Sequence, residues 1–321
     1  MANVRIGLTV PFIGIRLPAQ RELFLEAQDL GYTDLWSMEA DGYDAFTPLV
    51  LASQWVPQMR LGTAIAATFT RGPAILAQTA AALAELAPGR TILGIGSSSH
   101  AIVENWNGIP FAKPYSRTRD VLRFLRKAYA GEKVTETWDT FSIRGYRMAA
   151  PPAVPPKVYV AALRQRMLEL AAQEADGVIL NWLSAGDLKQ VMPILRAPGR
   201  DIDVVDRVFV CPTADRDAVR AMVRPAITGY LTTPVYSAYH RWLGRGEVLG
   251  GMWEAWAAGD RKKALAAVPD SVIDELVVHG SIEECRDKLH AYVDHGVTTL
   301  CYSLMPGDYD LRAAIRGLAR L

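Results

Sequence analysis

Hydrophobic and polar positions in residues 59–99 switch between two periods, and the switch predicts a strand, a helix and a second strand. The first apolar run, 59–66, has the composition of a buried strand and carries a Gly-Thr step where a bulge would fit. Apolar residues then recur at helical spacing over 73–86, from a proline in the first turn to a Pro-Gly pair that ends the helix. The apolar run 91–95 opens into a Gly-Ser-Ser-Ser loop at 96–99. Together these elements form a βαβ unit.

The same alternation continues along the whole chain. Strands are expected at 5–10, 34–38, 59–66, 91–95, 157–161, 177–180, 206–211 and 298–303. Helices are expected at 19–30, 46–55, 73–86, 116–130, 164–174, 185–195, 215–229, 281–295 and 308–321. Alternating strands and helices indicate a parallel sheet with helical crossovers, and eight strands favour closure into a barrel. We therefore expect an α/β protein whose residues 1–321 form a single (β/α)8 TIM-barrel domain.

Two segments do not fit this alternation. Residues 132–148 have the pattern of an edge hairpin outside the barrel. Residues 230–279 are too long for an ordinary connection and are rich in Trp, Tyr and Gly, which predicts a helical insertion between strands seven and eight. Its aromatic side chains, among them Tyr236, Tyr239 and His240, either pack on the barrel or line a substrate pocket at the barrel mouth.

Composition narrows the class of protein. The chain has 321 residues, of which 50% are hydrophobic, and a net charge of +1, so nothing favours nucleic acid or a membrane as partner. Cys211, Cys285 and Cys301 are widely spaced and have no paired histidines, so we expect neither a disulfide framework nor a metal site. The chain runs from its first residues straight into a strand and has no apolar run of about 18 residues, which predicts a cytoplasmic protein with a small-molecule substrate.

Three motifs in a fixed order carry a family resemblance. They are Leu-Gly-Thr at 61–63, Arg-Gly-Pro at 71–73 and Gly-Arg-Thr-Ile-Leu-Gly-Ile-Gly at 89–96. Further matching segments lie at 105–111, 116–119, 174–177 and 280–284. The chain resembles the bacterial luciferase-like monooxygenase superfamily and, within it, the branch that uses the deazaflavin coenzyme F420. The resemblance implies a barrel of the luciferase-like type, a homodimer, and a non-prolyl cis peptide between Ala64 and Ile65.

Candidate catalytic residues follow the second and fourth strands. Glu39 lies at the rim, where barrel enzymes place functional groups, although a helix cap or a surface turn is an alternative role. Relatives usually carry Asp at this position followed by a catalytic His, and many carry Glu at the position of Ser99; here Ala40 and Ser99 replace both groups. Glu39 and His100 are therefore the candidate proton carriers, and His100 has a side chain suited to proton transfer near neutral pH.

Candidate cofactor-binding residues lie at the ends of several strands. The loop 96–99 can present N–H groups and hydroxyls to a polar ligand, but it lacks the third glycine and the downstream acid of a dinucleotide fingerprint. Small residues at a helix N-terminus suit an anion, and in relatives the turn matching 161–163 holds the cofactor phosphate. Arg164 or Arg166 is either a further anion contact or an ordinary solvated arginine. With the positions implied by the resemblance, the set is Glu39, Thr63, Ala64, Ile65, Gly96, Ser97, Ser98, Ser99, Ala161, Ala162, Leu163, Arg164 and Asn181, the last of which has a buried structural role as its alternative.

Three functions remain possible at this stage. The resemblance favours an F420-dependent oxidoreductase that transfers a hydride between C5 of the deazaflavin and a small organic substrate. The second possibility is an FMN-dependent monooxygenase with the same fold. The third is a deazaflavin-binding protein without catalysis, since two groups that relatives use are absent.

Overall fold

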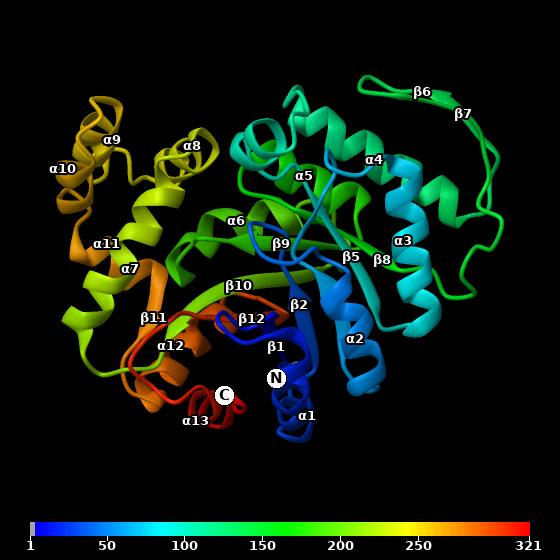
Figure 1. Ribbon diagram of the computed structural model, residues 1–321. Helices are drawn as coiled ribbons and strands as arrows, with labels where there is room; N and C mark the ends of the chain where they lie inside the picture. Colours follow the sequence, from blue (N-terminus) through cyan, green and yellow to red (C-terminus); the bar gives the residue numbers. More distant parts are fainter. Residues whose placement is uncertain (1–3) are drawn as a thin grey trace.

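Each apolar run that predicted a strand forms part of one parallel sheet, which closes on itself (Figure 1). The computed structural model describes residues 4–321. The barrel strands are β1 (Arg5–Val10), β2 (Asp34–Ser37), β3 (Arg60–Thr63) with β4 (Ala66–Ala67), β5 (Thr91–Gly96), β8 (Lys157–Ala161), β9 (Gly177–Asn181), β10 (Asp203–Cys211) and β12 (Thr299–Leu304). They pair in this order, and β12 returns to pair with β1, so the expected eight-stranded barrel is confirmed.

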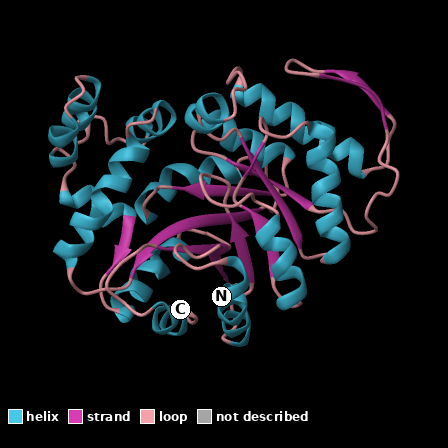
Figure 2. Ribbon diagram, in the orientation of Figure 1, coloured by secondary structure: helices cyan, strands magenta, loops and turns pink. Residues whose placement is uncertain are grey.

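Helices follow the strands and surround the barrel, as the separation of colours in Figure 2 shows. They are the 3₁₀ turn η1 (Leu17–Gln20), α1 (Arg21–Asp29), α2 (Thr47–Trp55), α3 (Pro73–Leu86), α4 (Pro114–Tyr129), α5 (Gln165–Glu174), the 3₁₀ turn η3 (Ala185–Asp187), α6 (Leu188–Arg196), α7 (Arg216–Leu231), α12 (Ile282–Asp294) and α13 (Leu311–Leu318). None of the described helices is long and apolar enough to cross a membrane.

Large side chains fill the barrel interior, and glycines on neighbouring strands make room for them. A Cβ on Gly62 would lie 2.3 Å from the ring of Trp36, and a Cβ on Gly94 would lie 2.0 Å from the carbonyl oxygen of Thr63. Trp36 packs in the interior with a set of buried residues from five other strands: Ile92, Tyr159, Ile179, Val205 and Cys301. This packed layer closes the centre of the barrel, so a ligand can enter only at the ends of the strands.

The insertion after α7 contains four helices and one strand. These are α8 (Pro234–Trp242), α9 (Gly250–Ala257), α10 (Arg261–Ala266), α11 (Asp270–Leu276) and β11 (Val277–His279). The helices gather on one side of the barrel, at the upper left of Figure 1, and β11 pairs with the outer end of β10. The insertion expected to be helical thus contains four helices and, in addition, the short strand β11. The expected hairpin, β6 (Val134–Thr137) with β7 (Ser142–Tyr146), projects on the opposite side.

Three local features refine the sequence-based expectation. The third strand is broken into β3 and β4, and the Ala64–Ile65 peptide between them is cis, as the resemblance implied. The strand β10 begins at Asp203, three residues before the expected start. The earlier residues were not assigned to the strand because polar residues interrupt its apolar pattern. The segment after β5 forms a π-helical turn, η2 (Ala101–Trp106), where only a loop was expected.

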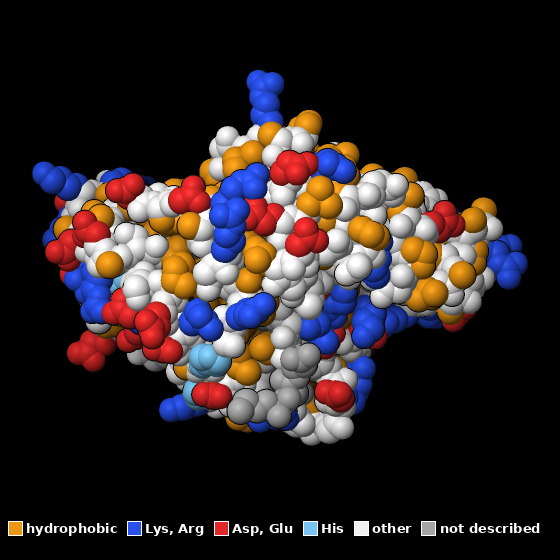
Figure 3. Space-filling view, turned by 90° about the horizontal axis from the view of Figure 1, so that it is seen from below, with side chains coloured by type: hydrophobic (Ala, Val, Ile, Leu, Met, Phe, Trp, Pro, Cys, Tyr) orange, Lys and Arg blue, Asp and Glu red, His pale blue; other side chains and the backbone are white. Residues whose placement is uncertain are grey.

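Figure 3 shows one face of the molecule, on which acidic and basic side chains alternate with scattered apolar ones. This face carries no field of a single sign, in agreement with the near-neutral net charge of the chain.

Candidate active site

A cavity of about 200 Å³ lies at the carboxyl ends of the barrel strands, where the sequence placed the site. Its walls come from the segments after β2, β3, β5 and β8, from β9 and β10, and from the start of the insertion. Ten of the predicted site residues line it: Glu39, Ala64, Ile65, Gly96, Ser97, Ser98, Ser99, Ala161, Leu163 and Asn181. The structure thus brings together residues from five regions of the sequence.

One part of the cavity lining is apolar. It is formed by Ala64, Ile65 and Ala161 around Gly96. A Cβ added to Gly96 would lie 3.2 Å from both Ala161 Cβ and Ile65 Cγ1, so the glycine lets these two residues approach the strand β5 closely. An apolar wall with no side chain at its centre fits the face of a planar aromatic ring.

The loop 97–99 forms a polar rim beside this wall. Ser98 adopts a left-handed backbone conformation with φ of +62°, which is uncommon for a residue other than glycine. The hydroxyl of Ser99 accepts a hydrogen bond from the N–H of Ile102 at 3.3 Å and so supports the start of η2. The residues that line the cavity therefore combine an apolar wall with small polar groups, which fits a ring that carries polar substituents.

Glu39 lines the cavity but is held firmly from behind. Its Oε2 accepts hydrogen bonds from Arg71 Nη1 at 2.6 Å and from the N–H of Ala67 at 3.3 Å. Its Oε1 accepts one from the N–H of Ala45 at 3.3 Å. The charge of Arg71 compensates that of the Glu39 carboxylate. Together with the two backbone N–H groups, Arg71 fixes the carboxylate at the rim of the cavity.

Four predicted site residues do not line the cavity. Thr63 is fully buried, and its hydroxyl donates to the carbonyl oxygen of Gly94 at 2.7 Å. Ala162 is buried behind the turn, whereas Arg164 is exposed at the N-cap of α5. His100 is exposed outside the cavity wall, and its Nε2 lies 3.1 Å from Oε2 of Glu104.

Sequence reasoning missed Arg207, which is 9% exposed and lies on the cavity wall. Its Nη2 donates to Ser303 Oγ at 2.9 Å, its Nε to Thr9 Oγ1 at 3.3 Å, and its Nη1 to Asn181 Oδ1 at 3.5 Å. The guanidinium carbon lies 4.7 Å from the ring centre of Phe209. The signal available in the sequence was a charged residue inside an apolar strand, which is costly to bury and therefore informative.

The insertion supplies further walls that the sequence had left open. Tyr230, at the end of α7, and Val235 and Tyr236, on α8, line the cavity together with Met38, Ala40, Ile102 and Ile179. Asn181 Nδ2 donates to the hydroxyl of Tyr236 at 2.7 Å, so the insertion is hydrogen-bonded to the barrel at the site. Burial raises the pKa of Tyr236, and its hydroxyl therefore stays protonated and retains a proton to donate. Tyr239 and His240 do not line this cavity.

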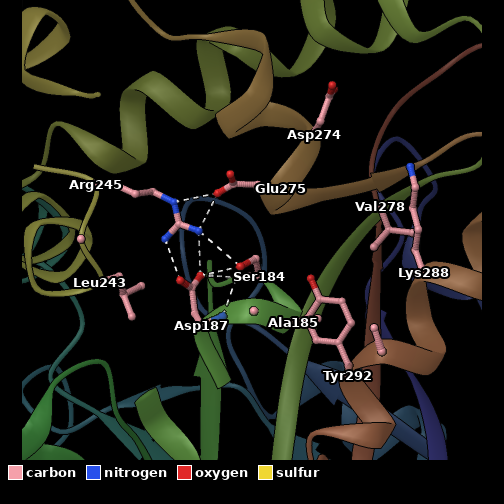
Figure 4. A pocket seen from close by; sticks show the side chains of 13 residues that line it. Ser184, Ala185, Asp187, Leu243, Arg245, Asp274, Glu275, Val278, Lys288 and Tyr292 are labelled. Atoms are coloured by element: carbon pink, nitrogen blue, oxygen red, sulfur yellow. Dashed lines mark hydrogen bonds and ion pairs between the residues drawn. The ribbon is translucent and has the colours of Figure 1, made fainter. Parts of the chain in front are cut away.

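A second, wider pocket of about 610 Å³ lies between the barrel and the insertion (Figure 4). Arg245 reaches into it and donates to Asp187 and Ser184 on one side and to Glu275 on the other. Its Nη2 lies 2.9 Å from both Asp187 Oδ2 and Glu275 Oε2. Arg245, Asp187 and Glu275 satisfy one another, and we interpret the pocket as the junction that holds the insertion on the barrel.

Unpaired polar groups surround this junction. Asp206, Tyr239 and His240 are fully buried, and their side chains have no hydrogen-bond partner within residues 4–321. Burial, and then the charge of Asp187, raise the pKa of Asp206 well above its usual value. Burial, and then the charge of Arg245, lower the pKa of His240 to about 3. Burial therefore disfavours the charged form of each group, the carboxylate of Asp206 and the imidazolium of His240.

The chain belongs to the luciferase-like monooxygenase family, whose model matches residues 5–299. A putative coenzyme F420-dependent oxidoreductase of Mycobacterium tuberculosis is 27% identical, and the match covers 93% of this chain and 94% of that protein. The family resemblance stated from the sequence motifs is thus confirmed.

Solved structures confirm the fold. The coenzyme F420-dependent tetrahydromethanopterin reductase from Methanopyrus kandleri has a TM-score of 0.81 at 21% identity, over 99% of this chain and 98% of that chain. The oxygenating constituent of 3,6-diketocamphane monooxygenase from Pseudomonas putida, a type II Baeyer–Villiger monooxygenase solved with FMN, has a TM-score of 0.69 at 15% identity, over 100% and 98%. At these identities the likeness shows the barrel and its connections.

Proposed function

We propose that this protein is an F420-dependent oxidoreductase that transfers a hydride between a deazaflavin and a small organic substrate. The observation that carries the proposal is the cavity at the barrel mouth, where the apolar residues Ala64 and Ile65 and the adjoining Gly96 meet the polar loop 97–99. The similarity to a putative F420-dependent oxidoreductase over nearly the whole chain supports the choice of cofactor. When bound, a deazaflavin exchanges a hydride at its C5 carbon.

The residues of the cavity would then bind and orient the cofactor and shield the reacting carbons from water. The apolar wall holds one face of the ring, and the loop 97–99 offers hydroxyls and N–H groups to its polar edge. The turn 161–163 precedes α5, whose N-terminal N–H groups and dipole favour the anionic part of the cofactor, with Arg164 beside them. Tyr230, Val235 and Tyr236 shield the reacting carbons from water.

Transfer of a hydride to or from a carbonyl or an alkene also requires movement of one proton. Glu39 is the carboxylate on the cavity wall, and we propose that it contacts the cofactor or carries this proton. His100 lies outside the wall and can act only if η2 rearranges. The two candidates are separable by Glu39→Gln and His100→Ala.

A positioned acid or base contributes roughly 10² to 10⁴ in rate. If Glu39 carries the proton, Glu39→Gln lowers the rate of the chemical step by about this factor and leaves deazaflavin affinity within a few fold. If the variant instead fails to bind deazaflavin, Glu39 anchors the cofactor. Parental rates in both variants would exclude a proton donor at either position.

The experiment that tests the proposed function is a titration of the purified protein with deazaflavin and with FMN. We expect tighter binding of the deazaflavin and, under anaerobic conditions, oxidation of the reduced cofactor in the presence of a panel of carbonyl and alkene substrates. Preference for FMN would favour a monooxygenase, which the structural likeness to an FMN-bound enzyme supports as the second candidate. Binding without transfer to any substrate would leave a non-catalytic deazaflavin-binding protein.

We also propose, from the family resemblance alone, that the protein forms a homodimer. Light scattering of the purified protein checks this expectation directly, and a monomer at micromolar concentration contradicts it.

A further inference from the structure

A buried positive charge on the wall of the active-site cavity has no counter-ion. Two charged side chains line the cavity, Glu39 and Arg207. Glu39 is paired with Arg71, whereas no Asp or Glu within residues 4–321 forms an ion pair with Arg207. The cavity therefore carries an excess of positive charge, located on a side chain that is largely buried.

The environment of Arg207 compensates only part of the cost of burial. Its donors meet the oxygens of Ser303, Thr9 and Asn181, which are neutral, and its guanidinium carbon lies over the ring of Phe209. A cation–π contact offsets some desolvation, but a buried charge is normally retained only where an opposite charge meets it. A position of this kind, which costs stability and lines a cavity, is typical of a binding site.

We propose that Arg207 is the receptor for a carboxylate on the substrate, so that the substrate of this enzyme is a small organic acid. This inference rests on the proposed function and adds the class of substrate to it. A guanidinium presents several N–H donors in one plane, which matches the two oxygens of a carboxylate. A single arginine on the wall of a cavity of about 200 Å³ suits one carboxylate better than a phosphate, whose greater charge calls for more cations.

Tyr236 is placed to contribute a second donor. Its hydroxyl oxygen already accepts a hydrogen bond from Asn181 Nδ2, so its own proton is directed elsewhere. Asn181 Oδ1 in turn accepts a hydrogen bond from Arg207 Nη1. Hydrogen bonds thus connect Arg207 on β10, Asn181 on β9 and Tyr236 on α8. The insertion thereby contributes to substrate recognition as well as to shielding the site.

The test compares two probes of nearly the same shape, benzoate and benzamide, on the protein saturated with deazaflavin. Dissociation constants from ligand-observed NMR titrations are measured for the parent and for Arg207→Met, which removes the charge but keeps a long apolar side chain. We expect the parent to prefer benzoate at least tenfold, and we expect Arg207→Met to lose this preference while its deazaflavin affinity stays within a few fold.

Two further variants keep the test decisive. Arg261→Met is the matched control, because Arg261 also lies over an aromatic ring, that of Trp256, but is exposed and outside the cavity. It should retain the full preference for benzoate. Arg207→Lys keeps the charge without the planar donor set and should show an intermediate preference, which secures a result if Arg207→Met does not fold.

Several outcomes overturn the proposal. Equal affinity of the parent for benzoate and benzamide would show that the cavity has no receptor for a carboxylate. Loss of deazaflavin affinity by more than tenfold in Arg207→Met, with no parental preference for benzoate, assigns Arg207 to the cofactor instead.

Failure of the parent to bind deazaflavin at all contradicts the proposed function but not this inference. The preference for benzoate is then measured on the protein without cofactor, and its presence or absence still decides the role of Arg207.

Discussion

Arg245, in the insertion, and Arg207, on β10, are both buried, but their surroundings differ. Arg245, 7% exposed, is bound by Asp187 and Glu275 at the junction between the insertion and the barrel. Arg207, 9% exposed, has only neutral partners and lines the cavity at the barrel mouth. A buried charge that the chain itself neutralises holds structure together, whereas one that it leaves open is available to a ligand. The difference separates a stabilising pocket from a binding pocket on the same molecule.

The largest effect that this comparison predicts is on stability. Arg245→Met leaves Asp187 buried without its partner, and breaking a buried pair in this way costs about 3 to 5 kcal/mol. Arg207→Met strands no carboxylate, so its free energy of unfolding should stay within about 1 kcal/mol of the parent. Urea unfolding of the two variants measures both values. Equal losses would show that Arg207 is as structural as Arg245.

The second prediction concerns the pH dependence of stability near the junction. Asp206 is fully buried, and burial and the neighbouring charge of Asp187 raise its pKa well above the usual value. The unfolded chain releases this proton above about pH 4, but the folded chain keeps it, so Asp206 destabilises the fold progressively as pH rises. The loss continues until pH reaches the folded pKa, above which it is constant.

Asp206→Asn removes this titration. As pH rises above about 4, the parent should lose stability relative to Asp206→Asn, because only the parent carries a carboxyl whose pKa is raised by folding. The exposed Asp217 offers a control, since Asp217→Asn should leave the pH profile unchanged. Parallel profiles for the parent and Asp206→Asn would place the carboxyl of Asp206 in contact with solvent or a cation.

Much of the fold was predictable because the barrel repeats one pattern. Apolar strands alternate with amphipathic helices, and every strand expected from this pattern is present. The strand β11 was missed because three residues, Val-Val-His, follow a helix without a turn signal and pair only with the outer end of β10. Pairing of this kind depends on where β10 ends in space, and the hydrophobic pattern of a short segment does not specify that position.

The site was predictable only in part. Strand ends and family motifs located Glu39, the loop 96–99 and the turn 161–163, because these positions follow from the barrel itself. Arg207 lies inside a strand, and whether its side chain points into the barrel or toward the helices depends on register. Tyr236 reaches the cavity through the packing of α8, which the spacing of aromatic residues does not specify.

The third prediction concerns Tyr236, the residue of the insertion that is hydrogen-bonded to the barrel at the cavity. Tyr236→Phe removes the hydroxyl that accepts from Asn181 Nδ2, and a hydrogen bond of this kind contributes about 0.5 to 1.5 kcal/mol. We expect benzoate affinity to fall about 2- to 10-fold and stability to change by about 1 kcal/mol. Tyr230→Phe is the control, since the hydroxyl of Tyr230, on the same cavity, forms no hydrogen bond within residues 4–321. Similar losses in both variants would mean that ring packing, rather than the hydroxyl, shapes the site.

The smallest effect is expected from arginines that water can screen. Arg164, at the N-cap of α5, and Arg166, whose guanidinium carbon lies 4.3 Å from the ring centre of Tyr115, are exposed beside the proposed site of the anionic cofactor tail. Changing both to Glu should weaken deazaflavin binding only a few fold at low salt, and the difference should vanish at high salt because exposed charges are screened. Reversal of Arg261 and Lys262 makes the same change in net charge outside the cavity and should have no such effect. A loss that persists in high salt would show that these arginines contact the cofactor directly, as Arg207 is proposed to contact the substrate.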